Sequence, residues 1–163
     1  MSLRPFFLPG GKELGRPIDA RGWEFEVETD TANTFARIGN LTSWNENPGE
    51  NEETADTTDF DSDGYYEQDV MQRGATIELS GQYSATSGTR DPGQDYVDKV
   101  WAYRFGEASR GTMRYRHTSQ TEWTVWECTV TPGERGGETN AKTSWGCTFT
   151  RCGAPTTAPV VTT

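Results

Sequence analysis

The alternation of apolar and charged residues constrains this chain more than any other feature, because a period of two places one face of a β-strand in a core and the other in water. Between Gly22 and Thr29, the residues Trp23, Phe25 and Val27 alternate with glutamates. Looser versions of the pattern predict further strands over residues 34–44, 65–71, 75–85, 112–118, 123–131 and 142–152. Six or seven strands joined by short turns predict a mostly β fold, either a sandwich or an open barrel.

One α-helix is predicted among the strands, around residues 92-105. Asp91 can cap it, Pro92 suits its first position, and Gln94 stands where a capping box needs its returning side chain. Gly106 offers a stop. A single helix flanking the strands completes the predicted fold. The residues that would share one face of the helix are Val97, Val100, Trp101 and Arg104 or Phe105.

The chain has room for one domain with short terminal extensions. Its 163 residues suffice for a core that folds unaided, and six Trp, six Tyr and seven Phe residues supply burial that a disordered chain lacks. Residues 1-20 show no period and are predicted to be an extended N-terminal arm. Residues 21-153 form the β domain, and residues 154-163 are predicted from their composition to be a flexible C-terminal tail.

The negative charge of the chain is concentrated in one segment. Between Gly39 and Gln72 lie ten of the 25 acidic residues and no Lys or Arg. The other 15 acids equal the 15 basic residues elsewhere, so the whole net charge of −10 belongs to this segment. Such a block repels nucleic acid and repels itself, and it is usually solvated, mobile or paired with a basic partner.

Most of these acids fall in a predicted long acidic loop over residues 45-64. The loop contains Pro48 and two glycines and shows no periodicity. Structureless segments of this length are uncommon inside a compact domain and are usually functional or disordered. We expect the loop to be poorly ordered in a free subunit, because like charges without a base nearby favour extension.

A short acidic motif inside this region has two interpretations. The stretch from Asp59 to Glu67 places carboxylates at positions 1, 3, 5 and 9 of the calcium-loop pattern, with Gly64 at position 6. Position 12, which should supply a bidentate glutamate, is Val70, and the flanks are loop and strand rather than two helices. An ion site stays open, but an Asp/Gly turn that ends the acidic loop is favoured.

The chain lacks the residue sets that catalysis needs. His117 is the only histidine, so a His-based triad or a multi-histidine metal site is impossible. Cys128, Cys147 and Cys152 make an odd number, which indicates reduced thiols in a reducing cytoplasm. No nucleophile elbow or phosphate loop is present. We therefore predict that the protein is not an enzyme and needs no cofactor or metal.

Two further features bear on binding. The strand residues Trp23, Trp123, Trp126 and Trp145 could stack on sugar rings if they were exposed. We favour a core role for most of them, because the chain has few Leu, Ile or Met residues from which to build a core. No apolar stretch is long enough to cross a bilayer, so membrane insertion is not expected.

Four motifs carry a family resemblance. Ile38-Gly-Asn-Leu-Thr-Ser precedes the acidic loop, Thr57-Thr-Asp-Phe-Asp-Ser-Asp-Gly-Tyr65 lies at its end, and Gln72-Arg-Gly-Ala-Thr-Ile-Glu-Leu-Ser-Gly81 is the strand that follows. The last predicted strand ends in Cys147-Thr-Phe-Thr-Arg-Cys-Gly153. Over about residues 22 to 153, this arrangement resembles the major tail tube proteins of long-tailed bacteriophages.

The resemblance implies a fold and an assembly. Subunits of that family are two packed antiparallel sheets flanked by one helix. Six subunits close a ring by joining one sheet from each into a lumen-lining barrel, and the rings stack into a tube through the long loop and terminal arms. The genome passes down the lumen, and a negative lumen suits DNA that must slide. The sequence leaves open which sheet would line the lumen.

The resemblance also implies partners and a location. The partners are further copies of the chain, the tape measure, tail terminator and tail tip proteins, and DNA in transit. The location is a virion tail that assembles in the host bacterial cytoplasm. The acidic loop becomes the predicted inter-ring stacking element, through Glu46, Glu50, Glu52, Glu53, Asp56, Asp59, Asp61 and Asp63. Its possible basic partners on a neighbouring subunit are Arg4, Lys12, Arg16, Arg114 and Arg116.

Two other functions stand as alternatives. A monomeric carbohydrate- or calcium-binding β-sandwich module would use the loop from Asp59 to Glu67 as its ion site. Another virion component with the same fold, such as a terminator or decoration protein, would assemble differently from a tube subunit. Rings or tubes of the purified protein would exclude the monomeric module.

Overall fold

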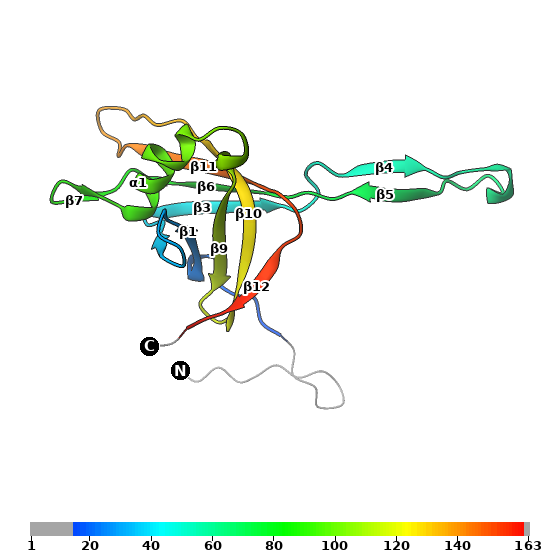
Figure 1. Cartoon of the computed structure of the whole chain (residues 1–163), viewed down its shortest axis with the longest axis horizontal. Helices are drawn as coiled ribbons and strands as arrows, with labels where there is room; N and C mark the ends of the chain where they lie inside the picture. Colours follow the sequence, from blue (N-terminus) through cyan, green and yellow to red (C-terminus); the bar gives the residue numbers. More distant parts are fainter. Residues whose placement is uncertain (1–14, 162–163) are drawn as a thin grey trace.

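One antiparallel sheet of eight strands dominates the described part of the chain, residues 15–161, in the computed structural model (Figure 1). The strands lie in the order β2-β1-β9-β10-β11-β6-β3, and β12 also pairs with β10. Two hairpins, β4-β5 and β7-β8, lie outside this sheet. The strands are β1 Trp23–Glu28, β2 Phe35–Arg37, β3 Leu41–Asn47, β4 Glu53–Asp56, β5 Gln68–Gln72, β6 Thr76–Gln82, β7 Ala85–Thr86, β8 Thr89–Arg90, β9 Gly111–His117, β10 Glu122–Pro132, β11 Ser144–Arg151 and β12 Thr156–Pro159.

Strand β10 belongs to both halves of the sheet. Its residues 122–125 pair with β12, whereas its residues 128–132 pair with β11. In Figure 1, β9 and β10 run steeply across β11, β6 and β3, so the two halves cross and pack face to face. The predicted mostly β fold is therefore confirmed, and its two packed sheets are two parts of one continuous sheet. The barrel stays open, because β2 and β3 end the sheet without pairing with each other.

Aromatic residues fill the space between the two halves. Trp126 of β10 and Trp145 of β11 are buried, as the core interpretation of the tryptophans predicted. The ring of Trp44 in β3 lies 4.9 Å from that of Trp23 and 5.4 Å from that of Phe25, both in β1. Opposite ends of the sheet are thus brought together through side chains alone.

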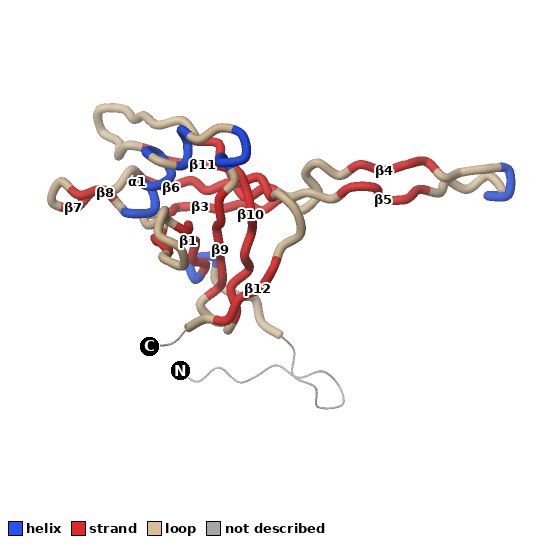
Figure 2. Tube along the Cα trace, in the orientation of Figure 1, coloured by secondary structure: helices blue, strands red, loops and turns tan. Residues whose placement is uncertain are grey.

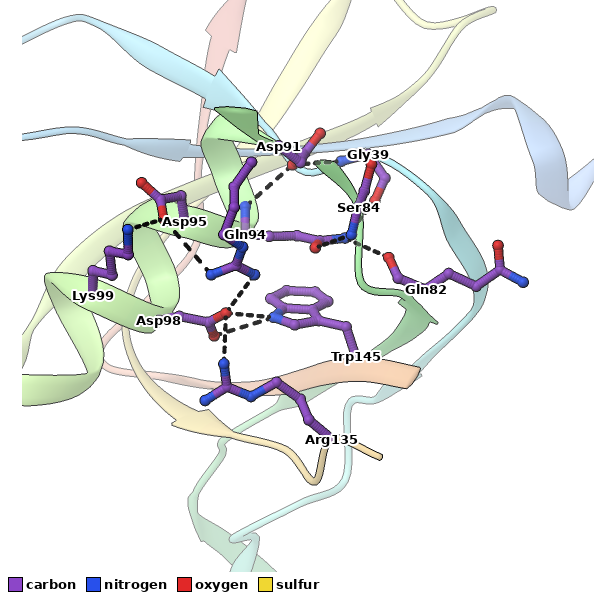
Figure 3. Close-up of polar contacts among 11 residues, drawn as sticks. Gly39, Gln82, Ser84, Asp91, Gln94, Asp95, Asp98, Lys99, Arg135 and Trp145 are labelled. Carbon is purple, nitrogen blue, oxygen red and sulfur yellow. Dashed lines mark hydrogen bonds and ion pairs between the residues drawn. The ribbon is translucent and has the colours of Figure 1, made fainter. Parts of the chain in front are cut away.

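The predicted helix is confirmed and begins as expected. α1 spans Pro92–Lys99, and the Asp91 carboxylate accepts from the amides of Gln94 (3.2 Å) and Gly39 (3.1 Å). The Gln94 side chain does not return to the cap. It is fully buried and bonds to Ser84, Gly39 and the carbonyl of residue 82, which fastens the helix to the sheet (Figure 3). The 3₁₀ turns are η1 Ala20–Gly22, η2 Phe60–Ser62, η3 Trp101–Tyr103 and η4 Gly106–Ser109.

The last part of the predicted helical face differs from expectation. Val97 and Trp101 are buried as predicted, but Phe105 is exposed. The α-helix ends at Lys99, and η3 follows it with only three residues per turn and is capped by Arg104 in an extended conformation, so Phe105 leaves the helical face.

A buried carboxylate ties the helix to the rest of the body. Asp98 is 8% exposed, and its oxygens accept from the indole nitrogen of Trp145 at 3.1 and 3.0 Å. Arg90 of β8 lies 2.8 Å from the same carboxylate, and Arg135 of the loop after β10 lies 3.4 Å from it (Figure 3). Because a buried charge is costly without partners, this cluster holds α1, β8, β11 and the loop in one arrangement.

Two segments predicted to lack regular structure contain strands. The segment 45-64 includes the end of β3 and all of β4, which pairs with β5 (Figure 2). The segment 154-163, predicted to be a flexible tail, contains β12, which pairs with β10. The composition of these segments did not predict either strand. Both strands are held by backbone pairing with another strand, and their own side chains are mostly exposed, so they show no apolar pattern. Residues 1–14 of the predicted N-terminal arm lie outside the described residues. No helix within residues 15–161 is long and apolar enough to span a membrane.

Candidate assembly surfaces

A two-stranded arm projects from the body (Figures 1 and 2). It continues β3 and β6 beyond the pair Asn47 and Thr76, and β4 and β5 form its antiparallel middle. All of β5 and most of β4 are exposed. We call residues 48–73 the arm. Its side chains face solvent rather than the core of the body, so its surface can meet another molecule.

Hydrogen bonds within the arm define the shape of its tip. The Asp59 carboxylate caps η2 by accepting from a backbone amide at 2.9 Å and from Ser62 Oγ at 3.2 Å. Ser62 Oγ also lies 2.9 Å from the carboxylate of Glu67. Asp63 and Gly64 then turn the chain back with φ values of 53° and 83°. The residues of the calcium-loop pattern thus form the favoured Asp/Gly turn. Within residues 15–161, no group of three or more His, Cys, Asp or Glu residues is arranged to hold a metal ion.

The tip carries large aromatic side chains that the rest of the described chain leaves exposed. Phe60 is fully exposed, Tyr65 is 77% exposed and Tyr66 is 66% exposed. Met71, on the returning strand, is 69% exposed. Because water disfavours contiguous apolar surface, a group of large exposed side chains marks a docking site more often than a free surface.

The acids assigned to inter-ring contact divide between body and arm. Glu46 lies in β3, half-buried, and accepts from the Tyr115 hydroxyl at 3.2 Å. Burial, aided by this carboxylate, raises the pKa of Tyr115 well above its usual range. Glu50 accepts from Asn47 at 2.8 Å at the base of the arm. The other assigned acids lie along the arm, namely Glu52, Glu53, Asp56, Asp59, Asp61 and Asp63.

Two of the predicted basic partners are engaged within their own subunit. Arg114 of β9 bonds to Glu26 at 2.6 Å, and Arg116 lies 3.6 Å from Glu24. Both guanidinium groups also lie over the ring of Trp123, at 4.2 and 5.1 Å from its centroid. Trp123 is therefore buried under arginines on the outer face of this half of the sheet, apart from the core cluster.

The remaining predicted partners lie near the N-terminus. Arg16 is exposed at the start of the described residues. Arg4 and Lys12 lie outside them. One basic residue of the arm itself was missed by the sequence prediction. Arg73, the last residue of the arm, lies 3.9 Å from Glu52.

An apolar groove opens where the two ends of the sheet face each other without pairing. Its walls include Trp23 and Phe25 of β1 and Leu41 and Trp44 of β3, and exposed Arg21 also lines it. Its volume is about 330 Å³. The groove is a direct consequence of the open barrel, because the strands that line it share no hydrogen bonds.

The outer face of the half-sheet β3-β6-β11 carries almost no charge. Cross-strand pairs align its outward residues in rows, such as Asn45 beside Glu78 and Glu78 beside Thr148. Glu78 is the one charged residue among the outward residues of these described strands. The others are Ser43, Asn47, Thr76, Ser80, Gln82, Ser144, Gly146 and Thr150, together with Asn45 and Thr148.

Reasoning from the sequence missed the apolar tip. Phe60 stands among Asp and Ser residues without alternation, and Tyr65 and Tyr66 were included in the predicted strand 65–71 but precede β5 in the structure. That absence of a period was the available signal: Phe60 and Tyr65 have no partners two or four residues away with which to form a buried face.

No protein-family model matches the chain, and no curated protein matches it by sequence. Solved structures match it by fold. A chain from the tail of an empty gene transfer agent (GTA) particle, computed with helical refinement and C6 symmetry, matches with a TM-score of 0.65 at 15% identity. The match covers 87% of this chain and 99% of that one. A chain from the virion of a native GTA particle matches with a TM-score of 0.62, the same identity and the same coverage. The protein therefore shares the fold of chains that occur in these particles.

Proposed function

We propose that this protein is a structural virion component that assembles into stacked hexameric rings, forming a tail tube through which DNA passes. The observation that carries the proposal is the fold shared over 99% of a chain from a tail particle with C6 symmetry. A structural, non-enzymatic role agrees with this. The arm, the open strand edges and the sheet face whose one charged residue is Glu78 each supply a feature that such a tube needs.

The uncharged face suits the lumen. DNA held by many phosphate contacts would not slide, because each Lys or Arg contact releases counterions and adds affinity. The outward side of β3-β6-β11 presents hydroxyl and amide groups with the single acid Glu78. The opposite half of the sheet presents Arg114 and Arg116 on its outer side. We therefore assign the β3-β6-β11 half to the lumen.

The open edges suit ring closure. Leu41–Asn47 of β3 pairs with β6 on one side, and no described strand pairs with its other side. An exposed edge of seven residues invites a further strand. Pairing of this edge with a neighbouring subunit would continue the half-sheet from one subunit to the next, and six such joints would close a barrel.

The arm is the proposed stacking element between rings. Its carboxylates would meet basic residues of the next ring, with Arg4, Lys12 and Arg16 as the proposed partners. Arg114 and Arg116 could join only by leaving Glu26 and Glu24. The tape measure, tail terminator and tail tip proteins are the further proposed partners, in a virion tail assembled in the bacterial cytoplasm.

Electron microscopy of the purified full-length chain tests the proposal. We expect six-fold rings or tubes, and light scattering should show large species whose size grows with protein concentration. A monomer that stays monomeric at high concentration would contradict the proposal. A charge test follows: Thr148→Lys should leave tubes intact while making them retain added double-stranded DNA, whereas Glu122→Lys, at an exposed position in the other half of the sheet, should not.

A further inference from the structure

We propose that the aromatic tip of the arm inserts into the Trp23–Trp44 groove of a second copy, and that this apolar contact, not the carboxylates, anchors one ring on the next. The inference rests on the proposed function and specifies its stacking contact. It is carried by two surfaces of this chain that are both incomplete in a single subunit.

The tip has the character of an anchor. Phe60, Tyr65 and Tyr66 are 106%, 77% and 66% exposed, so none of them contributes to the core of its own subunit. The capping bonds of Asp59 and Ser62 hold the backbone beneath them in one conformation. Because the backbone beneath them is already fixed, docking has to order the side chains but not the turn that carries them, which lowers its entropy cost.

The groove has the character of a receptor for such a tip. Trp23 and Trp44 pack on each other at 4.9 Å and are only half-buried, so their remaining indole surface lines the groove, above buried Phe25. Aromatic rings of a partner can pack on such indole surface. Exposed Arg21 adds a positive charge where an acidic tip would arrive. The other apolar hollow of the body, beside β2, is lined by both Arg37 and Asp91, so its charges balance, whereas Arg21 is the one charged residue among the described residues that line the groove.

The positions of the two surfaces favour a repeating contact. The groove includes Leu41 and Trp44 at the beginning of β3, whereas the arm leaves the body at Asn47, where β3 ends. Figure 1 shows β1 on the side of the body away from the arm. The arm reaches at most about 40 Å beyond β3 at about 3.3 Å per residue. Copies displaced along this direction therefore meet tip to groove. Because the two surfaces differ, each copy uses both, and the contact propagates as a head-to-tail stack.

Disulfide trapping tests the contact directly. In a Cys152→Ser background, where Cys128 and Cys147 are buried, Phe60→Cys and Thr42→Cys subunits are mixed and oxidised mildly. We expect crosslinked dimers that contain one subunit of each kind. Thr34→Cys, beside the other hollow, replaces Thr42→Cys as the matched control and should give at least about tenfold less product. Equal or greater trapping by Thr34→Cys, or none by Thr42→Cys, would overturn the proposal.

The other occupant of the groove would be the apolar N-terminal stretch of the chain. Phe6→Cys is therefore tested against Thr42→Cys under the same conditions. If this pair crosslinks and the Phe60→Cys pair does not, the N-terminal segment fills the groove and the proposal is wrong. Trapping is measured in solution whether or not tubes form, so a failure of tube assembly and a failure of this contact give different results.

Assembly supplies the second readout. The double variant Phe60→Ser with Tyr66→Ser should raise the protein concentration needed for tubes at least about tenfold, as expected for central aromatic anchors, while single rings persist. The double variant Tyr103→Ser with Phe105→Ser removes two exposed aromatics of the body and should leave the threshold unchanged. Salt screens charges but not apolar contacts, so added salt should not dissociate the tubes. Dissociation by salt, or equal effects of the two double variants, would contradict an apolar anchor.

Discussion

The body and the arm of this protein differ in how their strands are stabilised, although the arm continues the β3-β6 strand pair of the body. In the body, β6 buries Ile77 and Leu79 and turns polar residues outward, and β3 half-buries Leu41 and Trp44 beside it. In the arm, β5 has no buried residue at all. Backbone pairing therefore continues from the body into the arm, but the side chains of the arm are exposed instead of packing in a core. An isolated two-stranded ribbon is only marginally stable in water, so the arm depends on the body for its register.

Burial separates the aromatic side chains of the two regions. Body aromatics such as Phe149 are fully buried, whereas arm aromatics such as Phe60 are fully exposed. The same residue type therefore contributes to the core in the first case and contacts solvent in the second. Matched substitutions in the two regions can separate these roles.

The largest difference is expected for phenylalanine. Phe149→Ala should lower the free energy of unfolding by about 3–5 kcal/mol, because it opens a cavity among Trp101 and its neighbours. Phe60→Ala should change it by less than about 0.5 kcal/mol, since no described contact is lost. Urea unfolding followed by tryptophan fluorescence measures both. Comparable losses for the two variants would mean that the arm is part of the folding core.

A smaller effect is expected for carboxylates. Asp98→Ala removes the acceptor of Trp145 and the nearer of the two carboxylates beside Arg90, so the free energy of unfolding should fall by roughly 2–3 kcal/mol. Asp61→Ala, at the exposed tip, is the matched control and should be neutral. Thermal unfolding in the same buffer compares them. A neutral Asp98→Ala variant would show that the cluster in Figure 3 orders the helix without stabilising it.

Removal of the arm should cost the body less still. Replacing residues 49–73 by an Asn-Gly turn keeps the pair Asn47 and Thr76 and should change the free energy of unfolding by less than about 1 kcal/mol. Assembly into tubes should fail in the same variant. Circular dichroism and electron microscopy on one sample separate the two outcomes. Loss of the folded body would contradict the independence of the two regions.

The smallest effect is expected at the cap of the tip. Asp59→Ala removes the acceptor for the amide of Asp61 and should weaken the local turn by about 0.5–1 kcal/mol without changing global stability. Hydrogen exchange should then be faster at Asp61 and Ser62 alone. If exchange also increased in β6, the arm and body would be coupled more tightly than their burial indicates.

Local patterns in the sequence predicted much of the body. Alternation identified β1 and β6 and their buried faces, and the Asp91-Pro92 pair identified the start of α1. These features depend on neighbours two to four residues apart, which a single sequence displays directly. The role of Gln94 was misread for the opposite reason: its partners Gly39 and Ser84 come from distant parts of the chain.

The arm could be predicted only in part from local sequence patterns. Its acidity and its Asp/Gly turn could be recognised from composition and a short motif, and the assignment of residues 45-64 to contact came from the resemblance to tail tube proteins. That β4 pairs with β5 did not, because the pairing joins residues such as Glu53 and Gln72, whose side chains carry no periodic signal. Whether the arm stacks rings stays a prediction.

The sequence by itself determined which residues face a core, because apolar alternation acts over a few residues and needs no partner to be visible. Only the tertiary structure decided where the faces meet. β10 pairs with β12 along one part and with β11 along another, so the two halves of the sheet cross, Trp44 packs against Trp23, and the groove opens beside them. The physical reason is that a sheet bends through long-range pairing and packing, so a surface made by its two ends exists only once the whole chain has folded.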